Sequence, residues 1–297
     1  MNAPDWIAVD WGTSNLRVWA MSGATPVDQA TSDKGMGELA PDQFEPILAD
    51  LINPWPANLP IFACGMLGAK QGWVEAAYRK TPCAAVAPSA DLTKAPAKSL
   101  SVHIAPGICQ NAPADVMRGE ETQIAGYLAQ DPDFDGILCL PGTHTKWVHI
   151  SAGEVVSFRT FMSGELFALL SEHSVLRHSV NTDQWDADAF TAAVGDTMSR
   201  PERLAADLFG LRASDLLQGQ TASTARAKLS GLLIGAELAA ARPYWLGQPV
   251  VLIGAPALTE LYAAALAAQG VTAPRADSAP LTLAGLTAIY TTWKDSI

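Results

Sequence analysis

Two short loops in this sequence combine glycine with hydroxyl side chains, and each lies between two apolar runs. The residues of the two loops that could contact a phosphate are Gly12, Thr13 and Ser14 in the first, and Gly142, Thr143, His144, Thr145 and Lys146 in the second. Such a loop can point backbone N–H groups and hydroxyls at a phosphate, and a lysine can neutralise its charge. The alternative for each loop is a plain hairpin turn. We expect both loops to bind the phosphates of ATP, as in a phosphotransferase.

Asp10 lies where the first apolar run meets the first loop. A carboxylate in this place can hold Mg²⁺ through water while the ion bridges phosphate oxygens. The other interpretation is that Asp10 only accepts N–H groups of the turn, as aspartate often does. We expect Asp10 to bind Mg²⁺ and count it among the catalytic residues.

The two loops, in this order, resemble the phosphate-1 and phosphate-2 loops of the sugar kinase, heat-shock chaperone and actin superfamily. The resemblance implies a third element late in the chain, a strand, a glycine and a helix that contact adenosine. The run Val250–Leu258 occupies that position, and Gly254 and Ala255 would let the adenine lie close to the backbone. Alone this segment is weak evidence, because many α/β proteins contain a strand, a glycine and a helix in succession.

Within the superfamily, longer motifs resemble the 2-dehydro-3-deoxygalactonokinase family over nearly the whole chain, from about Asp5 to Lys294. The motifs are Asp10–Trp19, Cys64–Met66 with Gln71–Trp73, Asp115–Gln123, Leu140–Trp147, Phe158–Phe167 and Leu229–Leu238. The resemblance implies ATP-dependent phosphorylation of the 6-hydroxyl of 2-dehydro-3-deoxy-D-galactonate, a step of galactonate breakdown.

A phosphoryl acceptor hydroxyl needs a carboxylate that orients and deprotonates it. Sugar kinases of this superfamily commonly place an aspartate at the start of a helix, often after glycine. Here Glu120 follows Gly119, so the chain departs from that pattern, and Asp115, Glu120 and Glu121 compete for the role. We favour Glu120, then Asp115. The alternative is that Glu120 and Glu121 only stabilise the first turn of a helix, an effect of roughly 0.3–1 kcal/mol.

The implied substrate carries a carboxylate, which an arginine fork binds at two points. Three arginines lie near the motifs, Arg17, Arg118 and Arg159, and each could equally form an ion pair between lobes. By resemblance, the segment that touches the sugar also contains Gly65, Met66, Gln71 and Trp73. Trp73 could instead be a core aromatic.

The elements that must position these residues occur as strands followed by helices, twice along the chain. We expect strands at about 6–12, 15–21, 59–65 and 100–106, a helix at 44–52, and little regular structure at 81–98. After them we expect a helix at 120–130, strands at 137–140, 145–150 and 154–162, and mostly helix to 242 apart from 178–188. A strand at 249–254 and helices at 256–269 and 281–294 complete the chain.

The fold class implied is α/β, with two actin-like (ribonuclease H-like) lobes and an ATP and substrate cleft between them. We expect the first lobe at 1–115 and the second at 116–297. The last helix, about 281–297, belongs to the second lobe in chain order, and packing of this helix on the first lobe is the alternative.

Composition excludes several classes of protein. The net charge is −11 with charges scattered along the chain, whereas nucleic-acid binding needs a concentrated basic surface. No apolar run approaches the roughly 20 residues that span a bilayer, and the start lacks the pattern of a signal peptide, so we expect no membrane partner and a cytoplasmic protein. The four cysteines, at 64, 83, 109 and 139, lack metal spacing and are expected to be reduced core thiols. Composition leaves the oligomeric state undecided, and a homodimer is one alternative.

Two alternatives accompany the expected kinase. One is a kinase for another 2-keto-3-deoxy sugar acid or for a neutral sugar, because related acids differ at a single hydroxyl. The other is a nucleotide-switched binding protein like the chaperone and actin branches. At 297 residues the chain has no room for a separate peptide-binding domain, which disfavours the second alternative.

Overall fold

The computed structural model describes residues 3–297, and these residues form two compact units. The first unit contains the chain up to Asp135 together with Ile150–Ser157 and Ser278–Ile297, and the second contains Gly136–His149 and Phe158–Asp277. The expected lobe boundary at 115/116 differs from this division. The reason is that α2 (Glu120–Gln130) packs against α9 (Ser278–Lys294) inside the first unit. Residues 1 and 2, with which the expected first lobe begins, lie outside the described chain.

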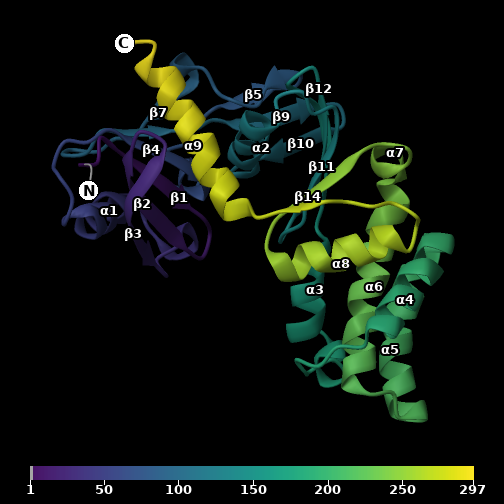
Figure 1. The fold of residues 1–297 in the computed structure, drawn as a ribbon. Coiled ribbons are helices and arrows are strands. Elements are labelled where there is room, and N and C mark those ends of the chain that lie inside the picture. The colour runs from purple at the N-terminus through teal and green to yellow at the C-terminus, as the bar shows by residue number, and fades with distance from the viewer. Residues whose placement is uncertain (1–2) are drawn as a thin grey trace. The chain divides into compact units, whose positions relative to one another are not determined.

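The first unit is built on a six-stranded sheet in the order β3-β2-β1-β4-β8-β7, of which Figure 1 labels β3, β2, β1, β4 and β7. Its strands are β1 (Trp6–Trp11), β2 (Leu16–Ser22), β3 (Thr25–Ser32), β4 (Ile61–Gly65), β7 (Thr93–Lys94) and β8 (Val102–Ile104). β1 pairs antiparallel with β2 and parallel with β4. This register places Asp10 beside Arg17 on one side and Cys64 on the other.

Both faces of this sheet are covered, as period-two alternation along β1 requires. Val9 and Trp11 pack in the cluster that contains Phe44 of α1 (Phe44–Ile52), whereas Trp6 and Ala8 pack in the cluster that contains Tyr290 of α9. Mainly apolar strands buried on both faces explain why the runs at 6–12 and 59–65 could be recognised as strands.

Helices α2 and α9 cross at a backbone contact that two glycines permit. A Cβ on Gly126 would lie 1.9 Å from the carbonyl oxygen of Leu281, and a Cβ on Gly285 would lie 1.9 Å from that of Thr122. No side chain larger than hydrogen fits at either position without separating the helices. The crossing therefore fixes α2, which carries Glu120 and Glu121, on α9.

A small sheet that the sequence did not indicate leads into α2. It contains β10 (Ala114–Met117), β9 (Gly107–Asn111) and β5 (Tyr78–Lys80) in that order. Its strands are short, and Tyr78, Lys80, Ala114 and Val116 are exposed, so the alternating pattern that reveals a strand is weak. The segment at 81–98 contains only β6 (Cys83–Ala84), a 3-10 turn at Ser89–Asp91 and β7, as its composition suggested.

The second unit contains strands β15 (Arg275–Ala276), β14 (Val250–Ile253), β11 (Gly136–Leu140) and β12 (Thr145–Ser151), in sheet order. β11 and β14 are parallel, and both are fully buried. The hairpin formed by β12 and β13 (Glu154–Phe161) crosses the division between the units. Its tip, Ile150–Ser157, is grouped with the first unit, where β13 pairs with β6.

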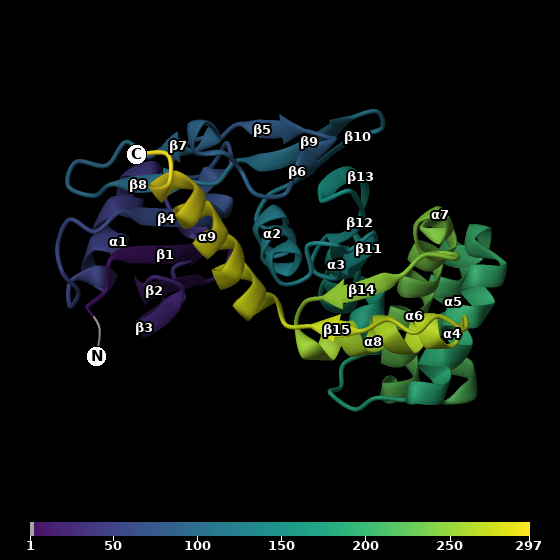
Figure 2. The same cartoon turned by 45° about the horizontal axis from the view of Figure 1, so that its top comes forward.

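Helices make up most of the rest of the second unit (Figure 2). They are α3 (Ser163–Glu172), α4 (Ala187–Ser199), α5 (Leu204–Gln218), α6 (Ala222–Ala240), α7 (Arg242–Trp245) and α8 (Pro256–Ala267). The buried α6 packs against α4, α5 and α3. The expected helical stretch and its interruption near 178–188 are confirmed, because α4 begins only at Ala187.

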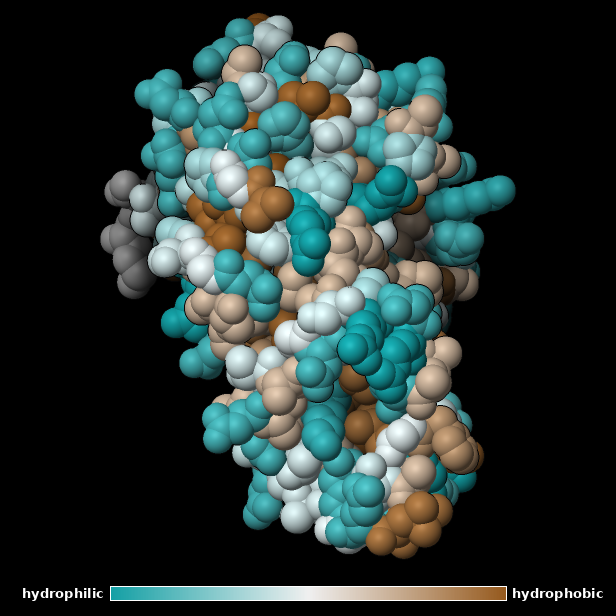
Figure 3. Space-filling view, turned by 90° about the vertical axis from the view of Figure 1, so that its right-hand side faces the viewer, coloured by the Kyte–Doolittle hydropathy of each residue, from teal (hydrophilic) through white to brown (hydrophobic). Residues whose placement is uncertain are grey.

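Helix α5 is largely exposed on its outer side. Phe209, Leu216 and Leu217 expose 65%, 65% and 83% of their surface. Figure 3 looks onto the side of the molecule on which α4–α6 lie, and brown apolar groups stand among teal polar ones at its lower end. Among the described residues, no helix has both the length and the apolar character that a membrane crossing requires. The expected α/β class is confirmed by the mixed sheets and helices of both units.

Candidate functional site

The first glycine loop is a tight hairpin between β1 and β2. Gly12 N–H donates to the carbonyl of Asn15 at 2.9 Å, and the side chains of Thr13 and Ser14 are exposed. A segment that sequence reasoning missed supports this loop. Met36 N–H donates to the carbonyl of Gly12 at 3.0 Å and Gly37 N–H to that of Thr13 at 2.9 Å.

Gly35 permits the close approach of this segment to the first glycine loop, because a Cβ at position 35 would lie 2.2 Å from the carbonyl oxygen of Thr13. The glycines at 35 and 37, on either side of Met36, were the available sequence signal, since paired glycines often mark a close backbone approach.

Asp10 forms an ion pair with its cross-strand neighbour. Arg17 Nη2 lies 2.5 Å from Asp10 Oδ2, and the Cys64 thiol lies 4.0 Å from Asp10 Oδ1. Cys64 is fully buried, and burial next to the Asp10 carboxylate raises the pKa of its thiol. Cys64 is therefore a core thiol and not a nucleophile, in agreement with the expected reduced cysteines. All four cysteines are free, and only Cys83 and Cys109 are half-buried.

Two glycines bring the start of α2 to the end of β4. Gly65 has φ +97° and Gly119 has φ +104°, both in the region that L side chains rarely adopt. A Cβ on Gly119 would lie 3.5 Å from the Cα of Gly65. Because Gly65 pairs with Trp11 on β1, the first turn of α2 lies near the end of the strand that carries Asp10.

The candidate bases occupy different environments. Glu121 is 3% exposed, and its Oε2 accepts from Gly119 N–H at 2.6 Å. Burial, with help from the neighbouring Glu120, raises the pKa of Glu121 to about 8. Glu120 is half-buried, and its Oε2 accepts from Arg118 N–H at 3.0 Å. Asp115 lies on β10 of the small sheet, and its side chain accepts from Val116 N–H at 2.8 Å.

Arg118 immediately precedes these carboxylates and is 9% exposed. Its Nη2 donates to the carbonyl of Ala76 at 2.7 Å, and its guanidinium lies over the ring of Tyr78, 4.4 Å from the centroid. Its Nε and Nη1 have no hydrogen-bond partner among the described residues. A buried arginine with unused donors is unusual, because buried polar groups are almost always paired.

The expected sugar-contact segment divides into core and surface residues. Trp73 is 6% exposed and stacks on Phe44, with ring centroids 5.8 Å apart, so its side chain belongs to the core. Gln71 is exposed, and Met66 is half-buried in the 3-10 turn Met66–Gly68 that follows Gly65. Spacing could not distinguish Trp73 from Gln71, since burial depends on contacts with α1.

The second glycine loop lies in the second unit and is held by the first turn of α3. Glu165 N–H donates to the carbonyl of Thr143 at 2.9 Å, and a Cβ on Gly164 would lie 2.2 Å from the carbonyl oxygen of Gly142. His144 Nε2 and Glu165 Oε2 lie 2.6 Å apart in a half-exposed pair. The exposed Thr143 and His144 remain available to a ligand.

Thr145 and Lys146 are buried at the start of β12, unlike the rest of the loop. Thr145 is 0% exposed, and its hydroxyl lies 2.9 Å from that of Tyr262. Lys146 is 4% exposed. The Thr145 hydroxyl thus supports the loop from the core, a position that follows from strand alternation with the buried Trp147.

A cavity of about 260 Å³ adjoins this loop within the second unit. Its lining is mainly apolar and comes from the second glycine loop, from α3, α6 and α8, and from the segment before α4: Gly142, Ser163, Gly164, Phe167, Trp185, Arg226, Ser230, Leu233, Ile234, Leu258, Leu261 and Tyr262. Arg226 lies over the ring of Phe167 at 5.1 Å. Gly254 packs on the loop, since a Cβ there would lie 3.1 Å from the carbonyl oxygen of Pro141, and Ala255 is exposed at the start of α8.

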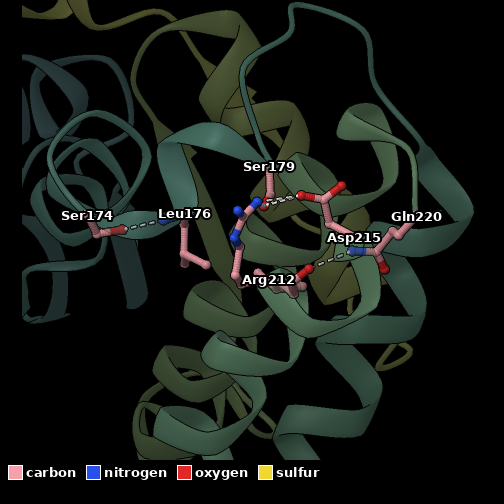
Figure 4. Close-up of polar contacts among 7 residues, drawn as sticks. Ser174, Leu176, Ser179, Arg212, Asp215 and Gln220 are labelled. Carbon is pink, nitrogen blue, oxygen red and sulfur yellow. Dashed lines mark hydrogen bonds and ion pairs between the residues drawn. The ribbon is translucent and has the colours of Figure 1, made fainter. Parts of the chain in front are cut away.

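The cavity wall includes Trp185, which lies on a loop fixed at both ends. At one end, Ser179 Oγ donates to Asp215 Oδ2 at 2.8 Å, and Arg212 Nη1 donates to the same oxygen at 2.8 Å (Figure 4). At the other end, Asp186 caps α4 by accepting from Ala189 N–H at 3.0 Å and from the Thr224 hydroxyl at 2.7 Å. These bonds lower the pKa of Asp186.

Arg159 is exposed on the part of β13 that belongs to the second unit, whereas Arg17 and Arg118 lie in the first. No group of three or more histidine, cysteine, aspartate or glutamate side chains suited to a metal is found among residues 3–297. A second cavity, of about 590 Å³ between α4, α5 and α6, has charged residues of both signs and none of either glycine loop.

Known proteins of one family are similar to this chain in sequence and in fold. A family model described as 2-keto-3-deoxy-galactonokinase matches residues 10–289. A candidate 2-dehydro-3-deoxygalactonokinase of Rhizobium meliloti (strain 1021) is 40% identical over 95% of both chains, and the 2-dehydro-3-deoxygalactonokinase of Escherichia coli (strain K12) is 35% identical over 92% of this chain and 94% of the other. The crystal structure of a candidate 2-dehydro-3-deoxygalactonokinase from Sinorhizobium meliloti matches 97% of this chain and 99% of the other at 40% identity, with a TM-score of 0.91.

Proposed function

The chain belongs to the 2-keto-3-deoxy-galactonokinase family, and we propose that it transfers the γ-phosphate of ATP to the 6-hydroxyl of 2-dehydro-3-deoxy-D-galactonate. It is a phosphotransferase with an alcohol acceptor, of the actin-like ATPase fold. The product would be the 6-phosphate and ADP, within D-galactonate catabolism. The observation that supports an acidic substrate is the environment of Arg118. This buried cation has donors without a partner among the described residues and lies two residues before Glu120.

The second unit supplies the features that favour a nucleotide. The cavity of about 260 Å³ is apolar, as a nucleobase requires, and it opens beside Gly142 of the second glycine loop. Thr143 and His144 are exposed next to it and are our proposed phosphate contacts, with Gly254 and Ala255 beside the adenosine. In the first unit we propose Gly12, Thr13 and Ser14 as further phosphate contacts.

Glu120 is the base that the geometry favours. Glu121 is buried, and a carboxyl with a pKa of about 8 holds its proton at neutral pH and so accepts none. Asp115 lies on a strand of the small sheet, four residues before Gly119, which makes the close contact with Gly65. Glu120 is half-buried at the first position of α2, beside that contact, where a carboxylate can meet a hydroxyl.

Asp10 suits Mg²⁺ of the kind that keeps most of its water. Its Oδ2 is paired with Arg17, and its Oδ1 makes a weak contact with the Cys64 thiol. Mg²⁺ in kinases is held by one or two carboxylates together with phosphate oxygens, so one aspartate is a sufficient protein ligand. The ion would neutralise charge on the transferred phosphoryl group.

Arg118 is our proposed anchor for the substrate carboxylate. Arg17 already spends a donor on Asp10, and Arg159 is exposed in the second unit. Arg118 keeps Nε and Nη1 unused, and its position is fixed by Ala76 and Tyr78. A fixed arginine favours an acid over a neutral sugar, because its charge is already desolvated and needs an anion.

A coupled assay of ADP release across C6 2-keto-3-deoxy acids tests this function, with gluconate and galactose as controls and with and without Mg²⁺. We expect turnover with the galactonate-derived acid and none when EDTA removes the metal. Preference for galactose would contradict the acid substrate. Slow ATP hydrolysis that no sugar acid accelerates would favour the nucleotide-switched alternative. A homodimer and a cytoplasmic location stay proposals, and light scattering of the purified chain measures the first.

A further inference from the structure

The motif Leu229–Leu238 contains a buried carboxylate that the proposed function does not use. Glu237 on α6 is 2% exposed. Its Oε1 accepts from Trp147 Nε1 at 2.8 Å, and its Oε2 accepts from the Tyr262 hydroxyl at 2.9 Å and from the Ser163 hydroxyl. A carboxylate is costly to bury, so three donors converging on it indicate a specific role.

The three donors come from three elements that surround the second glycine loop. Trp147 lies on β12, which leaves the loop, and Ser163 begins α3, whose next residues grip it through Gly164 and Glu165. Tyr262 lies on α8, which follows the adenosine segment at Gly254 and Ala255. Glu237 is therefore hydrogen-bonded to three elements around the second glycine loop. They are β12, which follows the loop, α3, whose first turn contacts it, and α8, which follows Gly254 and Ala255.

The hydrogen-bond direction extends this network to the loop itself. Because the Tyr262 hydroxyl donates its proton to Glu237, the hydroxyl of Thr145 must donate to Tyr262, 2.9 Å away. Thr145 is the first residue of β12, directly after His144. Its hydroxyl orientation is thus set by Glu237 through Tyr262, although Glu237 does not touch the loop.

Two members of the network also line the cavity of about 260 Å³ in which we propose that the nucleoside binds. Ser163 and Tyr262 are both part of its wall, next to Gly142 of the loop. We propose that Glu237 is a positioning residue that holds the second glycine loop at a fixed place relative to this cavity, so that base and phosphates of ATP are bound together. This inference rests on the proposed nucleotide site.

Burial raises the pKa of Glu237 in spite of its three donors. The bonds lower that pKa and desolvation raises it, and desolvation is the larger effect. Loss of any one donor therefore leaves a poorly solvated oxygen, and the network responds as a unit.

The test is ATP affinity, measured by calorimetry on the full chain, in Glu237→Gln, Tyr262→Phe and the double variant. Gln presents an N–H where the carboxylate accepted, so it reverses the bond with Tyr262 and frees the Thr145 proton. Tyr262→Phe removes only a hydroxyl. We expect each single variant to weaken ATP binding about tenfold, the factor for one charge-assisted hydrogen bond, while KM for the sugar acid changes less than about twofold. The double variant should be no weaker than either single variant, because both break one chain.

The matched control is Thr197→Val on α4. Thr197 is 1% exposed and its hydroxyl donates to the carbonyl of Ala193 in its own helix, so the substitution removes a buried hydroxyl that is not part of the Glu237 network. ATP affinity of wild-type strength in Glu237→Gln and Tyr262→Phe, with a fall in melting temperature like that of Thr197→Val, would overturn the inference. Should Glu237→Gln fail to fold, Tyr262→Phe alone decides. A wild-type chain that binds ATP but phosphorylates no acid would refute the proposed function and leave these affinity ratios meaningful.

Discussion

At the scale of residues, the buried polar side chains differ in whether their hydrogen-bond donors and acceptors have partners within the protein. Among residues 3–297, the buried side-chain nitrogens and oxygens that lack a hydrogen-bond partner both belong to Arg118. An unsatisfied buried donor costs roughly 1–3 kcal/mol. By contrast Arg17, Thr145 and Glu237 have partners within the protein. A ligand oxygen at Arg118 would therefore recover free energy that folding has lost.

Replacement of Arg118 by lysine tests this at the acid end of the substrate. Lysine keeps the charge but has no planar fork, so it cannot bond Ala76 and a ligand together. We expect KM for the keto-deoxy acid to rise at least about tenfold and KM for ATP to stay within about twofold. Steady-state kinetics with each substrate varied in turn measure both. Arg159→Ala serves as the comparison, and a larger effect there than at Arg118 would move the anchor to Arg159.

The raised pKa of Glu121 predicts a pH dependence of stability. Below about pH 4.5 the carboxyl is protonated whether the chain is folded or not. Between that pH and about 8 the folded chain keeps a proton that the unfolded chain releases, so the free energy of unfolding falls as pH rises. The charges that act on Glu121 are Glu120, which raises its pKa, and Arg118, which lowers it.

Glu121→Gln removes this titration. We expect the free energy of unfolding of the wild type to fall by at least about 1 kcal/mol more than that of the variant between pH 5 and pH 8. Urea unfolding at four pH values measures the difference. The exposed Glu202→Gln is the control, and parallel curves for wild type and Glu121→Gln would show that Glu121 is ionised in the folded chain.

At the scale of elements, the position of α2 depends on its crossing with α9. Gly285→Ala puts a methyl group 1.9 Å from the carbonyl oxygen of Thr122, so the helices must separate or α2 must shift. We expect a loss of roughly 1–3 kcal/mol and a fall in kcat, because Glu120 moves with α2. Thermal unfolding and turnover measure these.

The control for this change is Gly195→Ala on α4, where a Cβ meets no atom within 4 Å. Alanine is the better helix former, so this variant should be slightly more stable and fully active. An active Gly285→Ala enzyme of normal stability would mean that the two helices are not held in this close crossing.

The loop that carries Trp185 depends on a second helix, α5. Asp215 holds Ser179 at the start of the loop, and Arg212 completes the cluster. Asp215→Ala should release that end and weaken ATP binding about threefold to tenfold, while KM for the acid is unchanged. Calorimetric titration with ATP measures the effect. Asp207→Ala, which breaks the exposed pair with Arg203 on the same helix, should leave ATP binding as it is.

At the scale of the whole molecule, what could be read from the sequence was local. Both glycine loops, the strands that enter them and α2 were predicted because turn residues and periodicity are written in neighbouring positions. The support of Thr13 by Gly35 and the burial of Arg118 join residues far apart in the chain, so no spacing rule reveals them. Thr145 is intermediate, because the alternation of β12 places it in the core beside Trp147.

The position of the lobe boundary was beyond the sequence for the same reason. Helix α2 follows the small sheet directly, and its crossing with α9, more than a hundred residues later, places it in the first unit. The sequence already favoured Glu120 as the base, but the burial of Glu121, which supports that preference, follows from contacts that the sequence does not show. The sequence therefore predicted which segments are helices and strands, whereas the assignment of each to one of the two units depends on tertiary contacts.

The proposed ligand contacts predict where each ligand protects the backbone from hydrogen exchange. A non-hydrolysable ATP analogue should slow exchange at 12–14 in the first unit and at 141–146, 163–167 and 256–262 in the second, because the two glycine loops and the cavity lie there. The keto-deoxy acid should slow exchange at 64–76 and 117–122, around Arg118 and Glu120 in the first. Exchange followed by mass spectrometry resolves these segments, and bound ligand lowers the rate of local opening in proportion to its occupancy. The control is α5, which contributes to neither set, so its exchange should not change with either ligand. Protection of 141–146 by the acid alone, with none at 117–122, would show that the anchor for the carboxylate is not Arg118.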